Sequence, residues 1–95
     1  MKSIMQDEKV CFICGASDHG QLDEHHCFEG TANRKLSEKY GLKIWVCHTP
    51  CHMYGAYSIH DNKEVRQAIK RKAQRKFEET YPDLDFRKIF GRNYL

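Results

Sequence analysis

The sequence predicts a small α+β domain in which two short strands precede one long helix. Short β-branched and aromatic segments lie in the first half of the chain, and an apolar stripe with helical spacing dominates the second half. The chain has 95 residues, of which 31% are charged, and its mean hydropathy is -0.78. This composition is typical of a globular chain and excludes a disordered or membrane-spanning one.

We expect one domain over residues 1–95, because no repeat or linker interrupts the sequence. The polar first residues contain no apolar signal segment, so we expect a cytoplasmic protein. A chain of this size buries only about 60–65% of its unfolded surface, which leaves a hydrophobic core marginal. A structural metal would add the missing stability.

The first half predicts short elements separated by turns. Residues 21–28 alternate weakly and predict a first strand, followed by a loop over residues 29–33. Residues 34–40 predict one or two helical turns that end at the following glycine. The β-branched and aromatic segment 42–46 predicts a stronger strand, which leads directly to Cys47.

The second half predicts one basic amphipathic helix over about residues 61–81. Asp61 and Glu64 match a capping box, in which the Asp61 carboxylate accepts hydrogen bonds from the first-turn N–H groups. Apolar residues recur at three- and four-residue spacing until Pro82 ends the pattern. For the tail, residues 82–95, we expect a short helical segment that folds back onto the apolar stripe.

The five cysteines and six histidines favour metal binding or catalysis, because disulfides are rare in a reducing compartment. Two pairs, Cys11 with Cys14 and Cys47 with Cys51, supply four thiolates for a closed tetrahedral zinc site. The first pair has the usual C-x2-C spacing, and Gly15 can adopt the positive φ that closes such a turn. The second pair has the wider C-x3-C spacing.

Two features of the cysteine pattern stay open. Because the second spacing is wide, His48 or His52 could replace Cys51 as the fourth zinc ligand. Cys27 is left over, and we expect a packed small side chain there rather than a ligand or a nucleophile.

Four histidines, His25, His26, His52 and His60, are available for a second site. Zinc binding would bring the His25-His26 strand beside the segment that begins at Cys51-His52. Neutral imidazoles suit an open divalent-cation site, and an imidazole that does not bind the cation could act as a general base. Consecutive strand residues point to opposite faces, so both His25 and His26 can serve one phosphate only if the strand ends or bulges there.

This order of motifs resembles the HNH endonucleases, which have the ββα-metal fold, and especially the small members encoded by phages and prophages. The resemblance covers most of the chain, and its motifs lie at residues 11–15, 24–26, 31–41, 46–52 and 88–95. It implies a zinc-stabilised ββα-metal core over about residues 10–60. The segment before the second strand lacks the asparagine that normally orients the base loop, and Asn33 is the candidate substitute.

The resemblance also implies metal-dependent hydrolysis of DNA phosphodiesters. His26 is then the general base that activates water for in-line attack, and His25 and His52 bind one cation that stabilises the leaving 3′-oxygen. His60, eight residues after His52, is not placed by the resemblance; it could be a further ligand of this cation, a phosphate contact or a loop residue. The identity of this cation stays open among Mg²⁺, Mn²⁺, Ni²⁺ and Zn²⁺, because imidazole favours the softer metals.

Basic residues predict where DNA binds. Residues 63–76 carry seven Lys or Arg against one Glu, mostly opposite the apolar stripe, and beside a nuclease site a phosphate track is the better interpretation than a solvated face. With two residues near the histidine loop, the predicted DNA-binding set is Arg34, Lys35, Lys63, Arg66, Lys70 and Arg71. Expected partners are DNA and other phage DNA-processing or packaging proteins, with no membrane, in the cytoplasm of a bacterial host.

Two alternatives stay open. The first is a catalytically inactive, zinc-stabilised DNA- or protein-binding module in which His25 and His26 are structural, and the missing asparagine supports it. The second assigns all the Cys and His ligands to two structural zincs. The number of tightly bound zinc ions would separate this second alternative from a nuclease.

Overall fold

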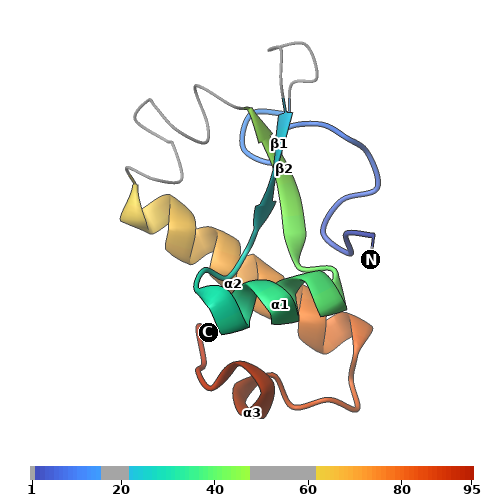
Figure 1. Ribbon diagram of the computed structural model, residues 1–95, viewed down its shortest axis with the longest axis vertical. Helices are drawn as coiled ribbons and strands as arrows, with labels where there is room; N and C mark the ends of the chain where they lie inside the picture. The colour runs from blue at the N-terminus through green and yellow to red at the C-terminus, as the bar shows by residue number, and fades with distance from the viewer. Residues whose placement is uncertain (1, 16–21, 48–61) are drawn as a thin grey trace.

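The computed structural model describes residues 2–15, 22–47 and 62–95 (Figure 1). The elements, in chain order, are β1 (Leu22–His26), α1 (Thr31–Tyr40), β2 (Lys43–Cys47), α2 (Lys63–Thr80) and α3 (Phe86–Phe90). The two strands pair as an antiparallel sheet, with α1 in the connection between them. The predicted α+β class is therefore confirmed.

The sheet pairs in one continuous register. Leu22 lies opposite Cys47 and His26 lies opposite Lys43, and each of the three residues between has its own partner. The pairing continues past β1, since the Cys27 N–H donates to the Leu42 carbonyl at 2.9 Å. Cys47 and the histidine pair therefore lie toward opposite ends of the same short ladder.

The helix α1 is longer than predicted. It begins at Thr31, within the segment expected to be a loop, because Gly30 adopts φ 94° as the N-cap and its carbonyl accepts from the Arg34 N–H at 2.8 Å. It ends as expected at Gly41, which is left-handed with φ 73°. A Cβ at Gly41 would lie 2.5 Å from the Lys2 carbonyl oxygen, so the N-terminal segment packs where only glycine fits.

The helix α2 is capped one residue later than predicted. The Asn62 side chain accepts from the Val65 N–H at 3.1 Å, so Asn62 is the N-cap, and Asp61 lies outside the described residues. The helix ends at Thr80, close to the predicted boundary. α3 is capped in the same way by Asp85, whose carboxylate accepts from the Lys88 N–H at 3.3 Å.

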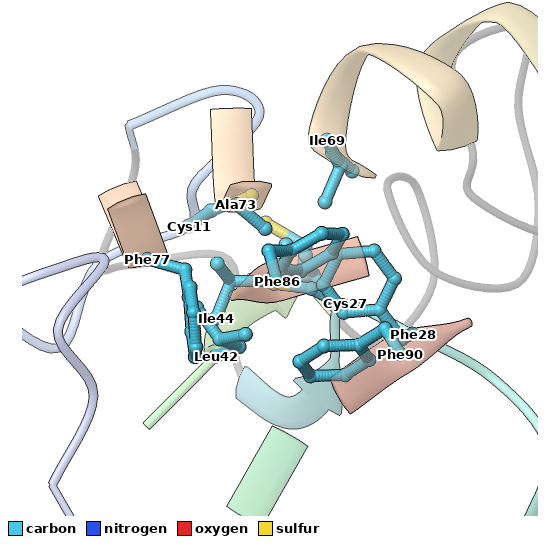
Figure 2. Packing of buried hydrophobic residues seen from close by; sticks show 12 residues of the cluster. Cys11, Cys27, Phe28, Leu42, Ile44, Ile69, Ala73, Phe77, Phe86 and Phe90 are labelled. Carbon is cyan, nitrogen blue, oxygen red and sulfur yellow. The ribbon is translucent and has the colours of Figure 1, made fainter. Parts of the chain in front are cut away.

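The core joins the sheet to α2 and α3 (Figure 2). Phe28, two residues after the end of β1, packs against the rings of Phe86, Phe90 and Tyr94 at centroid distances of 5.4, 4.8 and 5.1 Å. Phe77 of α2 lies 5.4 Å from the Phe86 ring. The predicted return of the tail onto the apolar stripe is confirmed.

The end of α1 also packs on α2. The Tyr40 ring lies 5.2 Å from Phe77 and 5.4 Å from Tyr81, and the Tyr81 hydroxyl donates to the Tyr40 carbonyl at 3.2 Å. These contacts fix α1, and the side chains on it, relative to the sheet. None of the helices in the described ranges is both long and apolar enough to cross a membrane.

Candidate metal centre and histidine site

Three of the four predicted zinc thiols converge. The sulfur atoms of Cys11, Cys14 and Cys47 all lie within 4.8 Å of one another, and Cys14 Sγ is 3.4 Å from Cys47 Sγ. Sulfurs this close match the donor set of a structural zinc site, so this thiol cluster could hold a metal ion such as zinc. The fourth predicted ligand, Cys51, lies outside the described residues, as do the alternatives His48 and His52.

The turn that carries the first two thiols is fastened to β2. The Phe12 N–H donates to the Trp45 carbonyl at 2.7 Å, which attaches the turn to the edge of the sheet. Gly15 has the predicted positive φ, 75°, and its N–H donates to the Cys11 carbonyl at 2.8 Å. Backbone hydrogen bonds therefore hold the cysteine turn beside the last residue of β2.

The thiol cluster favours one thiolate before metal binds. Burial disfavours the charged form of Cys11, but N–H groups of Cys14, Cys47 and Ile13 stabilise the thiolate and lower the pKa of Cys11 to about 6. Burial and the neighbouring thiols raise the pKa of Cys47 to about 12. A second or third thiolate in the cluster would repel the first. A bound divalent cation would offset this repulsion between thiolates, since metal ligation deprotonates thiols.

Cys27 is not part of the thiol cluster. Its side chain is buried, and burial raises its pKa. The prediction of a packed small side chain is confirmed.

The histidine pair lies at the end of β1, and its side chains leave the strand on opposite faces because the ladder has no bulge there. His25 lies on the α2 side, where it lines a small depression with Arg66 and Lys70. His26 lies on the α1 side, beside Glu38. Both histidines nevertheless line one pocket of about 250 Å³ with Glu24, Glu29 and Arg34.

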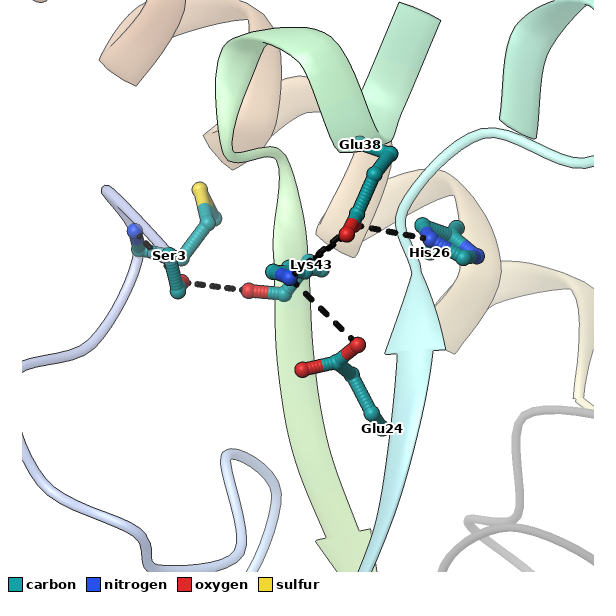
Figure 3. Close-up of polar contacts among 6 residues, drawn as sticks. Ser3, Glu24, His26, Glu38 and Lys43 are labelled. Atoms are coloured by element: carbon teal, nitrogen blue, oxygen red, sulfur yellow. Dashed lines mark hydrogen bonds and ion pairs between the residues drawn. The ribbon is translucent and has the colours of Figure 1, made fainter. Parts of the chain in front are cut away.

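His26 lies at the edge of a polar network and joins it through Glu38 (Figure 3). Its Nε2 atom lies 3.3 Å from Oε2 of Glu38 on α1. The same carboxylate is bound by the Lys43 ammonium, whose Nζ lies 2.9 Å from Oε2 and 3.1 Å from Oε1. Lys43 is only 7% exposed, and its Nζ also lies 3.4 Å from Glu24 Oε1.

The network fixes the charge of Glu38. The hydrogen bond from Lys43, with smaller contributions from His26 and the Lys43 charge, holds the pKa of Glu38 below its usual range. Burial opposes the charge of Lys43, but the two carboxylates raise its pKa above the usual value. Glu24, His26 and Glu38 have donor atoms within 4.8 Å of one another, but the Lys43 ammonium already binds both carboxylates and would compete with a metal cation.

The predicted DNA-binding residues fall into different environments. Arg34 and Lys35 are exposed and line a pocket of about 400 Å³ together with His26. Lys63 and Arg71 are exposed on α2.

Lys70 differs from the expected solvent-facing position. It is 8% exposed, its Nζ binds Glu29 Oε1 at 2.6 Å, and it lies 5.6 Å from the centre of the Tyr94 ring. The hydrogen bond from Lys70, aided by the charges of Lys70 and Arg66, keeps the pKa of Glu29 below its usual range. The ammonium of Lys70 is thus used inside the protein, where a DNA phosphate would have to displace Glu29.

His52 and His60, the other predicted ligands of the catalytic cation, lie outside the described residues.

Comparison with known proteins adds no relative: no family model, curated protein or solved structure matches this chain.

Proposed function

We propose that this chain is a metal-dependent endonuclease of the HNH type, with a ββα-metal architecture, that hydrolyses DNA phosphodiester bonds. The observation that supports it most is the shared pocket at the end of β1, which His25 and His26 line together with Arg34. Opposite-facing strand residues can act on one phosphate where a strand ends, and β1 ends at His26.

Arg34 is the residue of the pocket that suits a phosphate, because the two carboxylates of the lining, Glu24 and Glu29, are each bound by a lysine, Lys43 and Lys70. The Arg34 guanidinium offers paired N–H donors, which match two oxygens of one phosphate. His26 lies beside it with an imidazole that can remove a proton from water at neutral pH. The reaction then proceeds by attack of that water on phosphorus, with the 3′-oxygen as the leaving group.

The proposed catalytic cation, bound through His25 with His52 and His60, would stabilise the charge on the leaving oxygen. His25 provides a neutral nitrogen ligand, and the Glu29 carboxylate lines the same pocket. Imidazole and carboxylate together are a donor set that Mn²⁺, Ni²⁺ or Zn²⁺ accepts more readily than Mg²⁺. Of the described residues, His25 and Glu29 could hold a divalent cation, which would have to displace the Lys70 ammonium from Glu29.

A second function, a zinc-stabilised binding module without catalysis, is favoured by one specific observation. His26 contacts Glu38 within a network that links β1, α1 and β2, and an imidazole in such a network can be purely structural. The exposed Arg34 and Lys35 would then bind an acidic partner such as DNA without cutting it.

Conversion of supercoiled plasmid to nicked or linear DNA tests the proposal. The purified chain is incubated with Mg²⁺, Mn²⁺, Ni²⁺ or EDTA, beside the His26→Ala variant, and tightly bound zinc is counted in both proteins. We expect metal-dependent cleavage that His26→Ala abolishes, with unchanged zinc content and thermal unfolding. Absence of cleavage by folded, zinc-loaded protein with every cation would favour the binding module, and two tightly bound zincs would favour two structural sites.

A further inference from the structure

Glu38 contacts the imidazole proposed as the general base, and the sequence motifs assign it no role. It lies on α1, twelve residues after His26 in the chain, and reaches Nε2 of the imidazole at 3.3 Å across the end of β1 (Figure 3). The contact involves one specific ring nitrogen. This matters because the two nitrogens of a neutral imidazole have different functions: one carries the proton and the other accepts one.

The chemistry of the carboxylate decides which nitrogen carries the proton. Both Glu38 oxygens lie within 3.1 Å of the Lys43 ammonium, so the group is held as a carboxylate, which can only accept hydrogen bonds. Nε2 of His26 must then be the donor. The other ring nitrogen, Nδ1, is left without a proton when the ring is neutral.

The carboxylate is itself held in place. Lys43 lies at the start of β2, its side chain is only 9% exposed, and it is held from a second side by Glu24 of β1. The Ser3 hydroxyl donates to the carbonyl of Lys43 at 2.5 Å, which fastens the backbone there. Glu38 is therefore oriented by a buried cation rather than left to rotate in solvent.

We propose that Glu38 is a positioning residue that fixes the imidazole of His26 as the Nε2–H tautomer and so presents Nδ1 as the proton acceptor. Its catalytic consequence rests on the proposed nuclease function, whereas the tautomer itself does not. In the reaction, the water proton moves to Nδ1, and the imidazolium that forms keeps its Nε2–H bonded to the Glu38 carboxylate, whose negative charge stabilises it.

The tautomer is measured directly by NMR of the ¹⁵N-labelled full-length chain, at a pH where the imidazole is neutral. We expect His26 to show two well-separated ring nitrogen shifts, with the protonated type at Nε2. In Glu38→Gln, Lys43 retains the amide oxygen and the amide N–H₂ faces the ring, so the tautomer should reverse to Nδ1–H. In Glu38→Ala the two shifts should move toward each other as both tautomers become populated.

Glu24→Gln is the matched control, because it removes a carboxylate from the same ammonium without a hydrogen bond to the ring. It should leave the His26 tautomer unchanged. An Nδ1–H tautomer in the wild-type chain, or the same His26 shifts in wild type and Glu38→Gln, would overturn the proposal.

Cleavage kinetics separate this inference from the proposed function. We expect Glu38→Gln to lower kcat by about 10- to 100-fold, as for other residues that orient a reacting group, with KM and zinc content unchanged. Wild-type cleavage that Glu38→Gln does not slow refutes the positioning role and leaves the nuclease standing. If the chain shows the expected tautomers but cleaves no DNA, the nuclease proposal is refuted and the tautomer assignment stands.

Discussion

Replacing Cys14 by serine separates the stability that metal binding supplies from the stability of core packing. Cys11 and Cys47 are 1% and 0% exposed, so their replacement would also disturb the core. Cys14 is exposed, although its sulfur lies in the thiol cluster. In the presence of EDTA, Cys14→Ser should therefore unfold within about 0.5 kcal/mol of the wild type, as surface substitutions usually do.

With zinc present, the two proteins should differ strongly. A metal that binds only the folded state adds about 2.7 kcal/mol when its free concentration is about 100 times Kd. For a chain of this size, each kcal/mol shifts Tm by about 4–8 °C, so zinc should raise the wild-type Tm by about 10–20 °C. Cys14→Ser should lose most of this gain, because one of the three clustered thiolates is missing.

Thermal unfolding followed by circular dichroism, with and without EDTA, measures the stability of the metal-free proteins and the Tm gain that zinc produces. Elemental analysis counts the bound zinc. Cys27→Ala is the control: it removes a buried thiol outside the thiol cluster and should keep both the zinc and the Tm gain. Equal zinc content and an equal Tm gain in Cys14→Ser and wild type would refute the assignment of these thiols as ligands.

Three further outcomes are expected. Phe77 is fully buried, so Phe77→Ala should lower the free energy of unfolding by about 3–5 kcal/mol. Leu84→Ala, at a position 41% exposed, should change this free energy by less than about 0.5 kcal/mol. Urea denaturation measures both, and equal losses in the two variants would contradict the packing described. Because the folded-state pKa of Glu29 is lowered, its carboxylate should stabilise the protein above its unfolded-state pKa, and this contribution should be lost as pH falls through the folded-state value. Glu29→Gln should therefore cost about 0.2–1 kcal/mol at pH 7, a small value because the Glu29 side chain is 62% exposed. The difference should vanish once the pH lies below the folded-state pKa of Glu29, and a pH-independent difference would exclude the ion pair as its cause. If Lys63 and Arg71 each contact one phosphate, replacing both by glutamine should reduce the slope of log K against log salt by about 1.8 for duplex DNA, and an unchanged slope would assign both to solvent.

The elements of this fold could be predicted where a local pattern determines them. Periodic apolar residues give α2, and Gly41 ends α1 because its φ of 73° is one that glycine adopts without strain. The cysteine turn could be predicted from the C-x2-C spacing and Gly15, because Gly15 adopts its φ of 75° without strain. α1 begins three residues earlier than the sequence pattern predicts, because the glycine-containing segment before residue 34 resembles a loop, whereas Gly30 acts as an N-cap.

The environment of the histidine pair could be predicted only in part. The alternation of strand side chains correctly implied opposite faces for His25 and His26. It could not identify Glu38 or Lys43 as neighbours of His26, because that contact requires α1 to pack against the first residue of β2. A lysine that begins a strand is usually solvated, and nothing in its local sequence indicates burial.

In contrast to Lys43, Lys70 lies at a position where the sequence pattern indicates burial. It lies three residues before Ala73 and seven before Phe77, and residues at these spacings share one face of a helix. Ala73 and Phe77 are both fully buried, so the same spacing directs Lys70 toward the core. A buried ammonium requires an anionic partner, and the chain supplies Glu29 from the segment between β1 and α1. Charge counting over residues 63–76 treats every cation as available to DNA, whereas helical spacing separates the solvent-facing cations from Lys70, which joins α2 to the segment between β1 and α1.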